Sequence, residues 1–343
     1  MSSVRHRPTI ADVADLAQVS IATVSRVLNG SAPVGEEAAA RVREAVAELD
    51  YRPAAAARVL ATRRTNTIGL VLSRIGGDYF APLLRGIEAA TAAAGMNLLI
   101  SSGSPRSGAS VAEHSTDGLL GFADSLDDDE IRRLWRREHP LVLLHRTPPD
   151  DLPIPCVTVE NKAGARQLVD HLVEVHRASR IAFLRGPAGH EDSNWRELGY
   201  RESLLAHELE PDPALMGDGN FSASVAEQQV ASWLAEGREM DAIFAGDDAA
   251  AVGALQAIGA AGLDGRIAVV GFDDVPMAQH FSPRLTTVSA PTEQVGREAV
   301  RALLGLLRQQ DGTTPLLLLP TRLIVRQSCG CPVADANDGR AAR

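Results

Sequence analysis

Long apolar segments and cysteines are the features that this sequence lacks or uses sparingly. No run of about 18 consecutive apolar residues occurs, which excludes a membrane-spanning helix and predicts no membrane partner. The first nine residues are polar and basic with no apolar stretch behind them, so they do not have the pattern of a secretory signal. The cysteines are Cys156, Cys329 and Cys331, an odd number that is no disulfide framework. These absences predict a protein of the reducing cytoplasm.

Sequence signatures of enzymes are also missing. The chain has no Gly-x-Gly-x-x-Gly after a predicted strand, no P-loop, no His-Glu-x-x-His and no Gly-x-Ser-x-Gly. The polar stretch at residues 190–192 (His-Glu-Asp) is not a recognisable catalytic set, and no His, Cys, Asp or Glu cluster has metal-ligand spacing along the sequence. We therefore expect no catalytic residues, no cofactor and no metal site.

Charge is unevenly distributed along the 343 residues. The whole chain carries 34 Lys and Arg against 44 Asp and Glu, a net charge of −10. Residues 1–64 hold nine Arg against seven Asp and Glu, which leaves 25 basic and 37 acidic residues for the remainder. A mildly basic end on an acidic body indicates one part that binds nucleic acid and one that does not. The length suits two or three domains.

The first fifty residues carry the periodicity of three short helices. Thr9 and Asp12 have the spacing of a capping box before an apolar face that recurs through residues 10–17. Ser20 is a good N-cap for a second helix that ends at Asn29-Gly30, and a third helix is predicted over 36–49. Two short helices joined by a tight turn, with a third beside them, indicate a helix-turn-helix.

The outward face of the second helix suits contact with DNA. Arg26 can bond guanine bidentately, and Ile21 and Ala22 can contact thymine methyl groups. Thr23 and Ser25 can reach phosphates. Periodicity alone leaves an ordinary three-helix bundle with a solvated polar face equally open.

From residue 67 onward, short β-branched apolar runs alternate with helical patterns, which predicts a doubly wound, parallel α/β core that splits into two lobes. Folds of this kind bind small ligands near the carboxyl ends of their strands. We predict strands at 68–72, 96–100, 118–122, 141–144, 181–184, 242–245 and 267–271, and helices at 79–94, 128–137, 162–175, 194–208, 223–235 and 248–261.

Several motifs closely resemble the LacI/GalR family. They are Thr9–Ala14 (TIADVA), Val19–Gly30 (VSIATVSRVLNG), Leu49–Pro53 (LDYRP), Asp117–Leu120 (DGLL), Arg196–Tyr200 (RELGY), Ala245–Asp248 (AGDD), Val270–Asp274 (VGFDD), Leu285–Val288 (LTTV) and Leu323–Ser328 (LIVRQS). The resemblance implies an all-α helix-turn-helix head and a periplasmic-binding-protein-like α/β core of two lobes. The implied boundaries are 1–51 for the head, 52–66 for a hinge helix and 67–330 for the core. The polar composition of residues 331–343 predicts a disordered tail.

The resemblance also implies a function. It describes a DNA-binding transcriptional regulator, by default a repressor, that binds a palindromic operator as a homodimer and responds to a small molecule, with a sugar as the first expectation and a nucleobase or nucleoside as the second. An exported solute-binding protein and an enzyme on the same core are the alternatives, and the missing signal and motifs argue against them.

Individual site residues follow from the resemblance. Ile21, Ala22 and Arg26 are implied as base readers, Leu60 of the hinge as a wedge in a minor-groove base step, and Thr9, Ser20, Thr23, Ser25 and Asn29 as backbone contacts. The implied ligand contacts are Tyr79, Phe80, Arg196, Phe221, Asp247, Asp273 and Asp274, with His145 and Arg146 as weaker candidates.

Two departures from the family pattern stand out. The family often has Asn after the hinge proline, where this chain has Ala54. The segment 101–116 is too short and too rich in Gly and Pro for a full helix, so one helix of the first lobe is expected to be trimmed or missing, which bears on the dimer geometry.

Overall fold

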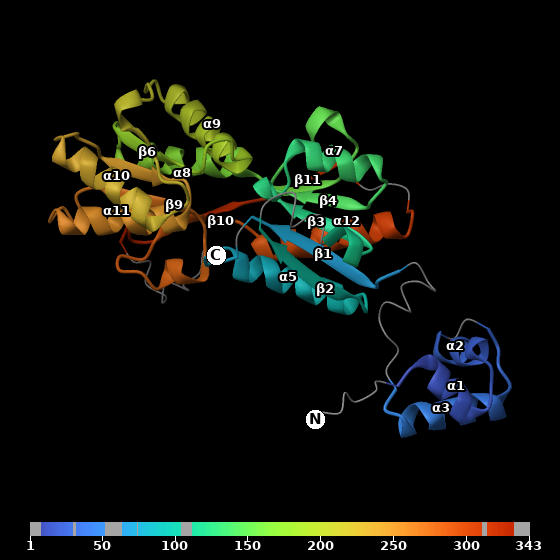
Figure 1. Ribbon diagram of the computed structural model, residues 1–343. Coiled ribbons are helices and arrows are strands. Elements are labelled where there is room, and N and C mark those ends of the chain that lie inside the picture. The colour runs from blue at the N-terminus through green and yellow to red at the C-terminus, as the bar shows by residue number, and fades with distance from the viewer. Residues whose placement is uncertain are drawn as a thin grey trace, which may run out of the picture. The chain divides into compact units, whose positions relative to one another are not determined.

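The computed structural model describes residues 8–29, 32–51, 64–73, 75–103, 112–310 and 314–332. The chain forms two compact units, residues 1–65 and 66–343, which we call the head and the core (Figure 1). No helix in the described ranges is long and apolar enough to cross a membrane. The predicted hinge position Leu60 and residues 333–343 of the predicted tail lie outside the described residues.

The head consists of the three predicted helices, α1 (Ile10–Ala17), α2 (Ile21–Asn29) and α3 (Glu36–Glu48). Thr9 caps α1 through the predicted capping box with Asp12. The apolar faces of the three helices meet in one small core around Val13, Val24 and Val42, all fully buried. Arg41 of α3 donates from Nε to the carbonyl oxygen of Ala17 (3.1 Å), which ties α3 to the end of α1.

The first lobe of the core contains β1 (Thr67–Leu72), α5 (Phe80–Ala93), β2 (Asn97–Ser102), β3 (Gly118–Phe122), α7 (Asp128–Arg136), β4 (Leu141–Leu144), β5 (Cys156–Val159), α12 (Thr292–Leu307) and β11 (Leu316–Leu319). Its strands form a parallel sheet in the order β11-β5-β4-β3-β1-β2. Alternate residues of the strands point to opposite faces. Leu120 and Val142 pack against α5 and α12, whereas Leu119 and Leu141 pack against α7.

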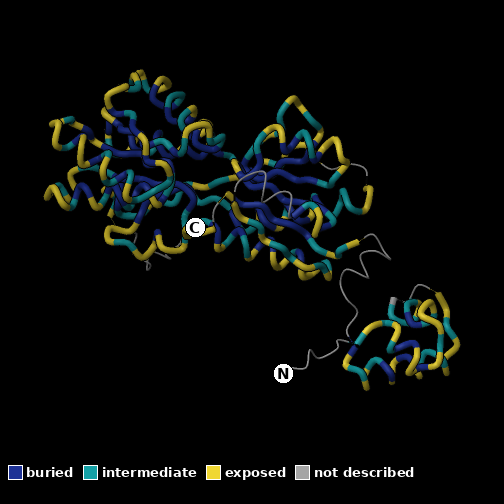
Figure 2. Tube along the Cα trace, viewed as in Figure 1, coloured by how far each residue is buried: buried dark blue, intermediate teal, exposed yellow. Residues whose placement is uncertain are grey.

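The second lobe contains α8 (Asn161–His176), β6 (Ile181–Arg185), α9 (Glu191–Ala206), β7 (Met216–Asp218), α10 (Ala223–Ala235), β8 (Ala242–Ala245), α11 (Asp248–Ala260), β9 (Ala268–Asp273), β10 (Thr286–Ser289) and β12 (Arg322–Ile324). Its sheet has the order β12-β10-β9-β8-β6-β7, and only the pair β10–β12 is antiparallel. Helices α8 and α9 cover one face and α10 and α11 the other. The central strands of both lobes are the buried centre of the core (Figure 2), whereas the edge strands β2 and β12 are partly exposed.

The chain passes between the lobes at three places, after β5, after β10 and after β11. Short 3₁₀ turns lie at Ala123–Ser125, Pro149–Asp151, Pro213–Leu215 and Pro276–Gln279. In the segment predicted to be trimmed, residues 112–115 form one helical turn before β3, and residues 104–111 lie outside the described part.

All predicted strands and helices of the core are present, but the start of one helix is wrong. The helix predicted over 194–208 begins at Glu191, because Glu191 and Asp192 are acidic first-turn residues that the helix dipole favours. Helix α12 was not predicted, although Val295, Ala299 and Leu303 are spaced for one buried face. Five strands were also missed (β5, β7, β10, β11 and β12), because three or four residues are too few to show a clear alternation of apolar and polar positions.

Candidate functional site

The outward surface of α2 is the first candidate site. Ile21, Ala22 and Arg26 are all exposed, and Ile21 as a residue is 52% exposed, which is high for a large apolar residue in a folded unit. Val24, on the opposite side of the helix, is fully buried in the core of the head. The helix therefore presents a small apolar patch and a guanidinium to a partner, as a helix that enters a major groove must.

Three of the other predicted head residues, Thr9, Ser20 and Thr23, lie at helix starts. Ser20 Oγ accepts a hydrogen bond from the backbone N–H of Thr23 (3.1 Å) and lies 2.9 Å from the Thr23 hydroxyl, so this pair caps α2. Thr9 holds the same position on α1. Ser25 is half-buried, and Asn29 is the last residue of α2. The capping N–H groups and hydroxyls at the two helix starts are the kind of donors that bind phosphate.

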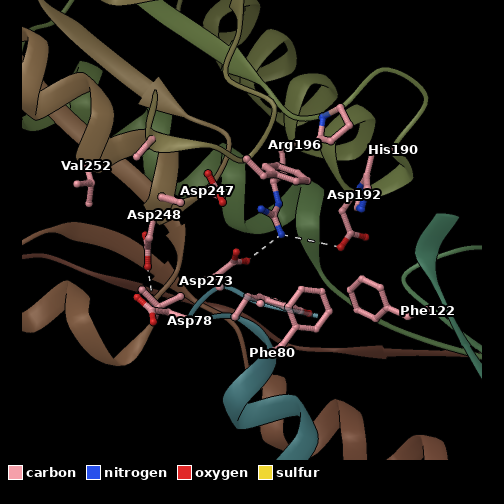
Figure 3. A pocket seen from close by; sticks show the side chains of 18 of the residues that line it. Asp78, Phe80, Phe122, His190, Asp192, Arg196, Asp247, Asp248, Val252 and Asp273 are labelled. Carbon is pink, nitrogen blue, oxygen red and sulfur yellow. Dashed lines mark hydrogen bonds and ion pairs between the residues drawn. The ribbon is translucent and has the colours of Figure 1, made fainter. Parts of the chain in front are cut away.

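The second candidate site is a cavity of about 560 Å³ between the two lobes (Figure 3). That volume is in the range of small-molecule sites. Of the seven predicted ligand contacts, six line it: Tyr79, Phe80, Arg196, Phe221, Asp247 and Asp273. The seventh, Asp274, does not. Both Asp273 and Asp274 have positive φ (105° and 55°), and this turn sends Asp273 toward the cavity while Asp274 accepts a hydrogen bond from Arg326 (2.7 Å).

Arg196 of α9 is the central polar group of the cavity. Only 3% of its surface is exposed, and it donates to Asp273 Oδ1 (3.0 Å), to Asn161 Oδ1 (2.9 Å) and to the carbonyl oxygen of Gly246 (2.6 Å). The guanidinium also lies over the ring of Phe272, 3.8 Å from its centroid. Because all three guanidinium nitrogens donate hydrogen bonds to protein groups, the Arg196 side chain is held in one orientation without a ligand.

Asp192, one turn before Arg196 on α9, joins the two lobes. Its Oδ2 lies 2.7 Å from His145 Nδ1 at the end of β4 in the first lobe, and 3.9 Å from Arg196 (Figure 3 shows Asp192 and Asp273 on either side of Arg196). Burial by itself would raise the Asp192 pKa, but the charge of His145, its hydrogen bond and the charge of Arg196 outweigh burial and lower the pKa to about 2. His145 Nε2 is in turn 2.7 Å from the Tyr79 hydroxyl.

We expect the stabilisation from Asp192 to disappear in acid. The pKa of about 2 in the folded state lies below the ordinary value of 3.8. The ionised group therefore contributes about 2 kcal/mol above the unfolded-state pKa, a contribution lost as the pH falls from about 4 toward 2. Urea unfolding of the wild type and of Asp192→Asn at pH 6, 4 and 3, followed by tryptophan fluorescence, should give stabilities that converge as the pH falls. A difference that stays constant over this range would contradict the assigned ion pair.

Two other carboxyl groups of the cavity have a raised rather than a lowered pKa. Burial raises the pKa of Asp273, and the charge of Arg196 offsets only part of this increase. Burial raises the pKa of Asp248 well above its ordinary value, with the neighbouring charge of Asp273 as the next cause. Asp248 accepts hydrogen bonds from the Thr287 hydroxyl (2.5 Å) and the backbone N–H of Val275 (2.8 Å), and Asp247 caps α11 through the N–H of Ala250 (2.8 Å).

Sequence reasoning did not select several residues of this cavity. The main ones are Asp78, Asp124, Asp192, Asp248, Phe122 and His190. Asp192 was passed over because the predicted helix started two residues too late to include it, so its i,i+4 relation to Arg196 could not be seen. His145, a weaker candidate, does not line this cavity but contacts it through Tyr79 and Asp192.

Comparison with known proteins places the chain. Residues 9–54 match the family described as bacterial regulatory proteins, lacI family, and residues 169–329 match the periplasmic binding protein-like domain. The HTH-type transcriptional regulator CelR of Thermobifida fusca is 35% identical over 340 residues, covering 94% of this chain and 99% of CelR. This chain belongs to the LacI family.

Solved structures agree with the LacI-family assignment. The lac repressor dimer bound to operator and the anti-inducer ONPF has a TM-score of 0.82 at 28% identity, covering 94% of this chain and 99% of that one. A complex of CelR with cellobiose has a TM-score of 0.71 at 33% identity, covering 94% and 100%. The predicted fold class is confirmed, and this LacI-family protein is a DNA-binding transcriptional regulator rather than an enzyme.

Proposed function

We propose that this regulator is a cytoplasmic repressor that binds a palindromic operator as a homodimer and that a neutral sugar, bound between the lobes of the core, controls its hold on DNA. The observation that carries the sugar assignment is the polar lining of the interlobe cavity. A sugar ligand agrees with the ligands of solved relatives: CelR has been solved with cellobiose, and another LacI-family regulator with bound ribose. The cytoplasmic location follows from the DNA partner, because chromosomal DNA lies in the cytoplasm of bacteria.

The cavity suits a ligand that is rich in hydroxyl groups and carries no negative charge. Six aspartates but one arginine are found among its described lining residues, and that arginine is already paired with Asp273. Carboxylates accept hydrogen bonds from hydroxyl groups, and they repel a phosphate. Phe80, Phe122 and Phe221 supply apolar ring surface for the C–H faces of a sugar ring. This combination favours a neutral saccharide over a sugar phosphate.

A ligand in this cavity can act on both lobes at once. Apart from the His145–Asp192 pair, Glu191 of the second lobe accepts a hydrogen bond from the backbone N–H of Thr147 in the first (2.7 Å). Contacts of the ligand with Tyr79 on one side and Arg196 on the other therefore bias how far the lobes close. The chain enters the first lobe from the hinge, so differential binding to open and closed cores shifts operator affinity by linkage.

In the proposed operator complex, the residues implied by the family resemblance divide between base edges and the DNA backbone. Ile21, Ala22 and Arg26 read base edges, and Leu60 wedges a minor-groove step at the centre of the operator. Thr9, Ser20, Thr23, Ser25 and Asn29 contact the DNA backbone. Two copies of the head on one symmetric dimer require an operator with matching two-fold symmetry.

Arg26→Ala is expected to weaken operator binding by about 1–3 kcal/mol, or roughly 5- to 150-fold, and to relax the choice of base at one position in each half-site. Fluorescence anisotropy with operator variants at fixed salt measures both effects. Arg43→Ala removes the same charge from the exposed surface of α3 and is the matched control, for which we expect a small loss without change in base preference. Equal losses in both variants, with unchanged base preference, would show that Arg26 acts only as a charge.

A thermal-shift panel tests the proposed effector class. Neutral mono- and disaccharides, sugar phosphates and nucleosides are compared, since any ligand of the native state raises the melting temperature by mass action. We expect stabilisation by a neutral saccharide, and operator binding repeated with that compound then distinguishes an inducer from a corepressor. Stabilisation by a sugar phosphate or a nucleoside alone would overturn the sugar assignment and leave the DNA-binding function intact.

A further inference from the structure

We propose that His171, His176, Cys329 and Cys331 form a structural zinc site in the second lobe, away from the interlobe cavity. One ligand atom from each of the four side chains lies within 4.8 Å of every other. Two thiols and two imidazoles are the donor set of a closed, tetrahedral zinc site. This proposal revises our expectation, drawn from spacing along the sequence, that the chain has no metal site.

Three of the distances between the donor atoms match the edges of a tetrahedron around one ion, and all the donor atoms lie within 4.8 Å of one another. Cys331 Sγ lies 3.3 Å from His176 Nε2 and 3.8 Å from His171 Nε2, and Cys329 Sγ lies 3.6 Å from His171 Nε2. Zinc bond lengths of about 2.3 Å to sulfur and 2.0–2.1 Å to nitrogen give tetrahedron edges of about 3.3–3.8 Å. The four side chains therefore need only small movements to accept the ion.

The backbone holds both cysteines in place. Ser328, next to Cys329, donates from its hydroxyl to the carbonyl oxygen of Val269 in β9 (2.6 Å) and accepts from the N–H of Thr286 in β10 (2.8 Å). Gly330 has φ of +96°, a conformation that favours glycine, and it turns the chain so that Cys331 returns toward His176. The two histidines come from the last two turns of α8. Two separate elements thus present two ligands each.

A hydrogen bond to Cys329 Sγ from outside the four ligands also supports the zinc site. The Thr286 hydroxyl lies 3.1 Å from Cys329 Sγ and donates to it, while its oxygen accepts from the backbone N–H of Arg326 (2.8 Å). Hydrogen bonds to ligating sulfur from outside the ligand set are usual in metal sites because they stabilise the thiolate. Cys329 is buried, with 2% of its surface exposed, and Cys331 and the histidines are half-buried.

Binding would exchange two thiol protons for the ion: Zn²⁺ enters, both cysteines become thiolates, and two protons leave to solvent. Because all four positions are taken by protein, no position is open for a substrate and the role is structural. The ion would connect the end of the described chain to the end of α8, which adds to the stability of the second lobe.

Metal analysis of the full-length, untagged protein, purified in reductant without chelator, is the primary test. We expect about one zinc per chain, lost in Cys331→Ser and in His176→Gln. Cys156→Ala, which removes the one cysteine outside the cluster, and His280→Gln, which removes an exposed histidine, are the matched controls and should keep the metal. Chelation should lower the melting temperature of the wild type but not of Cys331→Ser.

Cobalt titration of the metal-free wild type tests the ligand set without relying on the folding of any variant. The wild type should show the absorption of tetrahedral Co²⁺ with a thiolate charge-transfer band. Cys156→Ala should give the same spectrum, and Cys331→Ser, which loses the metal, should give none. A count of free thiols after denaturation should give the full three. Three free thiols with no metal and no cobalt spectrum would overturn the site, as would a single free thiol, which would mean a Cys329–Cys331 disulfide.

Discussion

Arg196→Met is expected to lower the unfolding free energy of the core by about 3–5 kcal/mol, the usual effect of removing one partner from a buried ion pair. Methionine can still pack on Phe272, but Asp273 and Asp192 lose their shared cation in a buried setting. We also expect the effector to lose its stabilising effect on the protein. All three tryptophans (Trp135, Trp195 and Trp233) belong to the core, so urea unfolding followed by fluorescence reports on this unit.

Arg196→Lys is the control for charge in this experiment. Lysine keeps the cation near Asp273 but cannot reproduce the three hydrogen bonds of the guanidinium to Asp273, Asn161 and the Gly246 carbonyl. We expect it to recover part of the stability and little of the effector response. Wild-type stability and response in Arg196→Met would show that the buried network has no role in either.

Gly253→Ala is expected to destabilise the core by about 1–3 kcal/mol and to weaken effector binding. At this position α11 packs on α10 so closely that a Cβ would overlap the carbonyl oxygen of Ala223 and lie 2.9 Å from the nitrogen of Glu227. These are backbone atoms, so the two helices must move apart. Ala223 and Val252 line the interlobe cavity, and the movement therefore changes one of its walls.

Gly259→Ala, on the same helix, is expected to stabilise the core rather than destabilise it. A Cβ there would meet only the carboxylate of Asp264, at 3.3 Å or more, and that side chain can rotate away. Alanine is favoured over glycine inside a helix by about 0.5–1 kcal/mol, so this variant should be slightly more stable than the wild type. Parallel urea unfolding of the two variants is the measurement. Shifts in the same direction would contradict the packing of α11 against α10.

The elements of the head were predictable because their signals are local. The capping box of Thr9 and Asp12 spans four residues, and helical periodicity alone places Val24 and Arg26 on the buried and the exposed side of α2. The same holds for the long helices and central strands of the core. Short strands such as β7 and β12, with three residues each, depend on their neighbours in the sheet and were missed.

The cavity was predicted only in part, because its contacts join residues that are distant in the sequence. Arg196 and Asp273 were selected from motifs, whereas their contact joins residues 77 positions apart. Asp192 needed the true start of α9, and its pairing with His145 needed the packing of one lobe on the other. Asp274 is the clearest example of a contact that the sequence does not predict. Asp273 and Asp274 are adjacent and have similar sequence context, but their backbone conformations direct them to different arginines, Arg196 and Arg326.

The sequence by itself determined the helix-turn-helix, the alternation of strands and helices and the family. Each of these depends on residue order within one element or one motif. The tertiary structure alone decided which carboxylates gather around Arg196, and it brought Cys329 and Cys331 to histidines about 155–160 residues earlier in the chain. The physical reason is that periodicity selects the buried face of an element, whereas strand order and helix packing select which elements share a site.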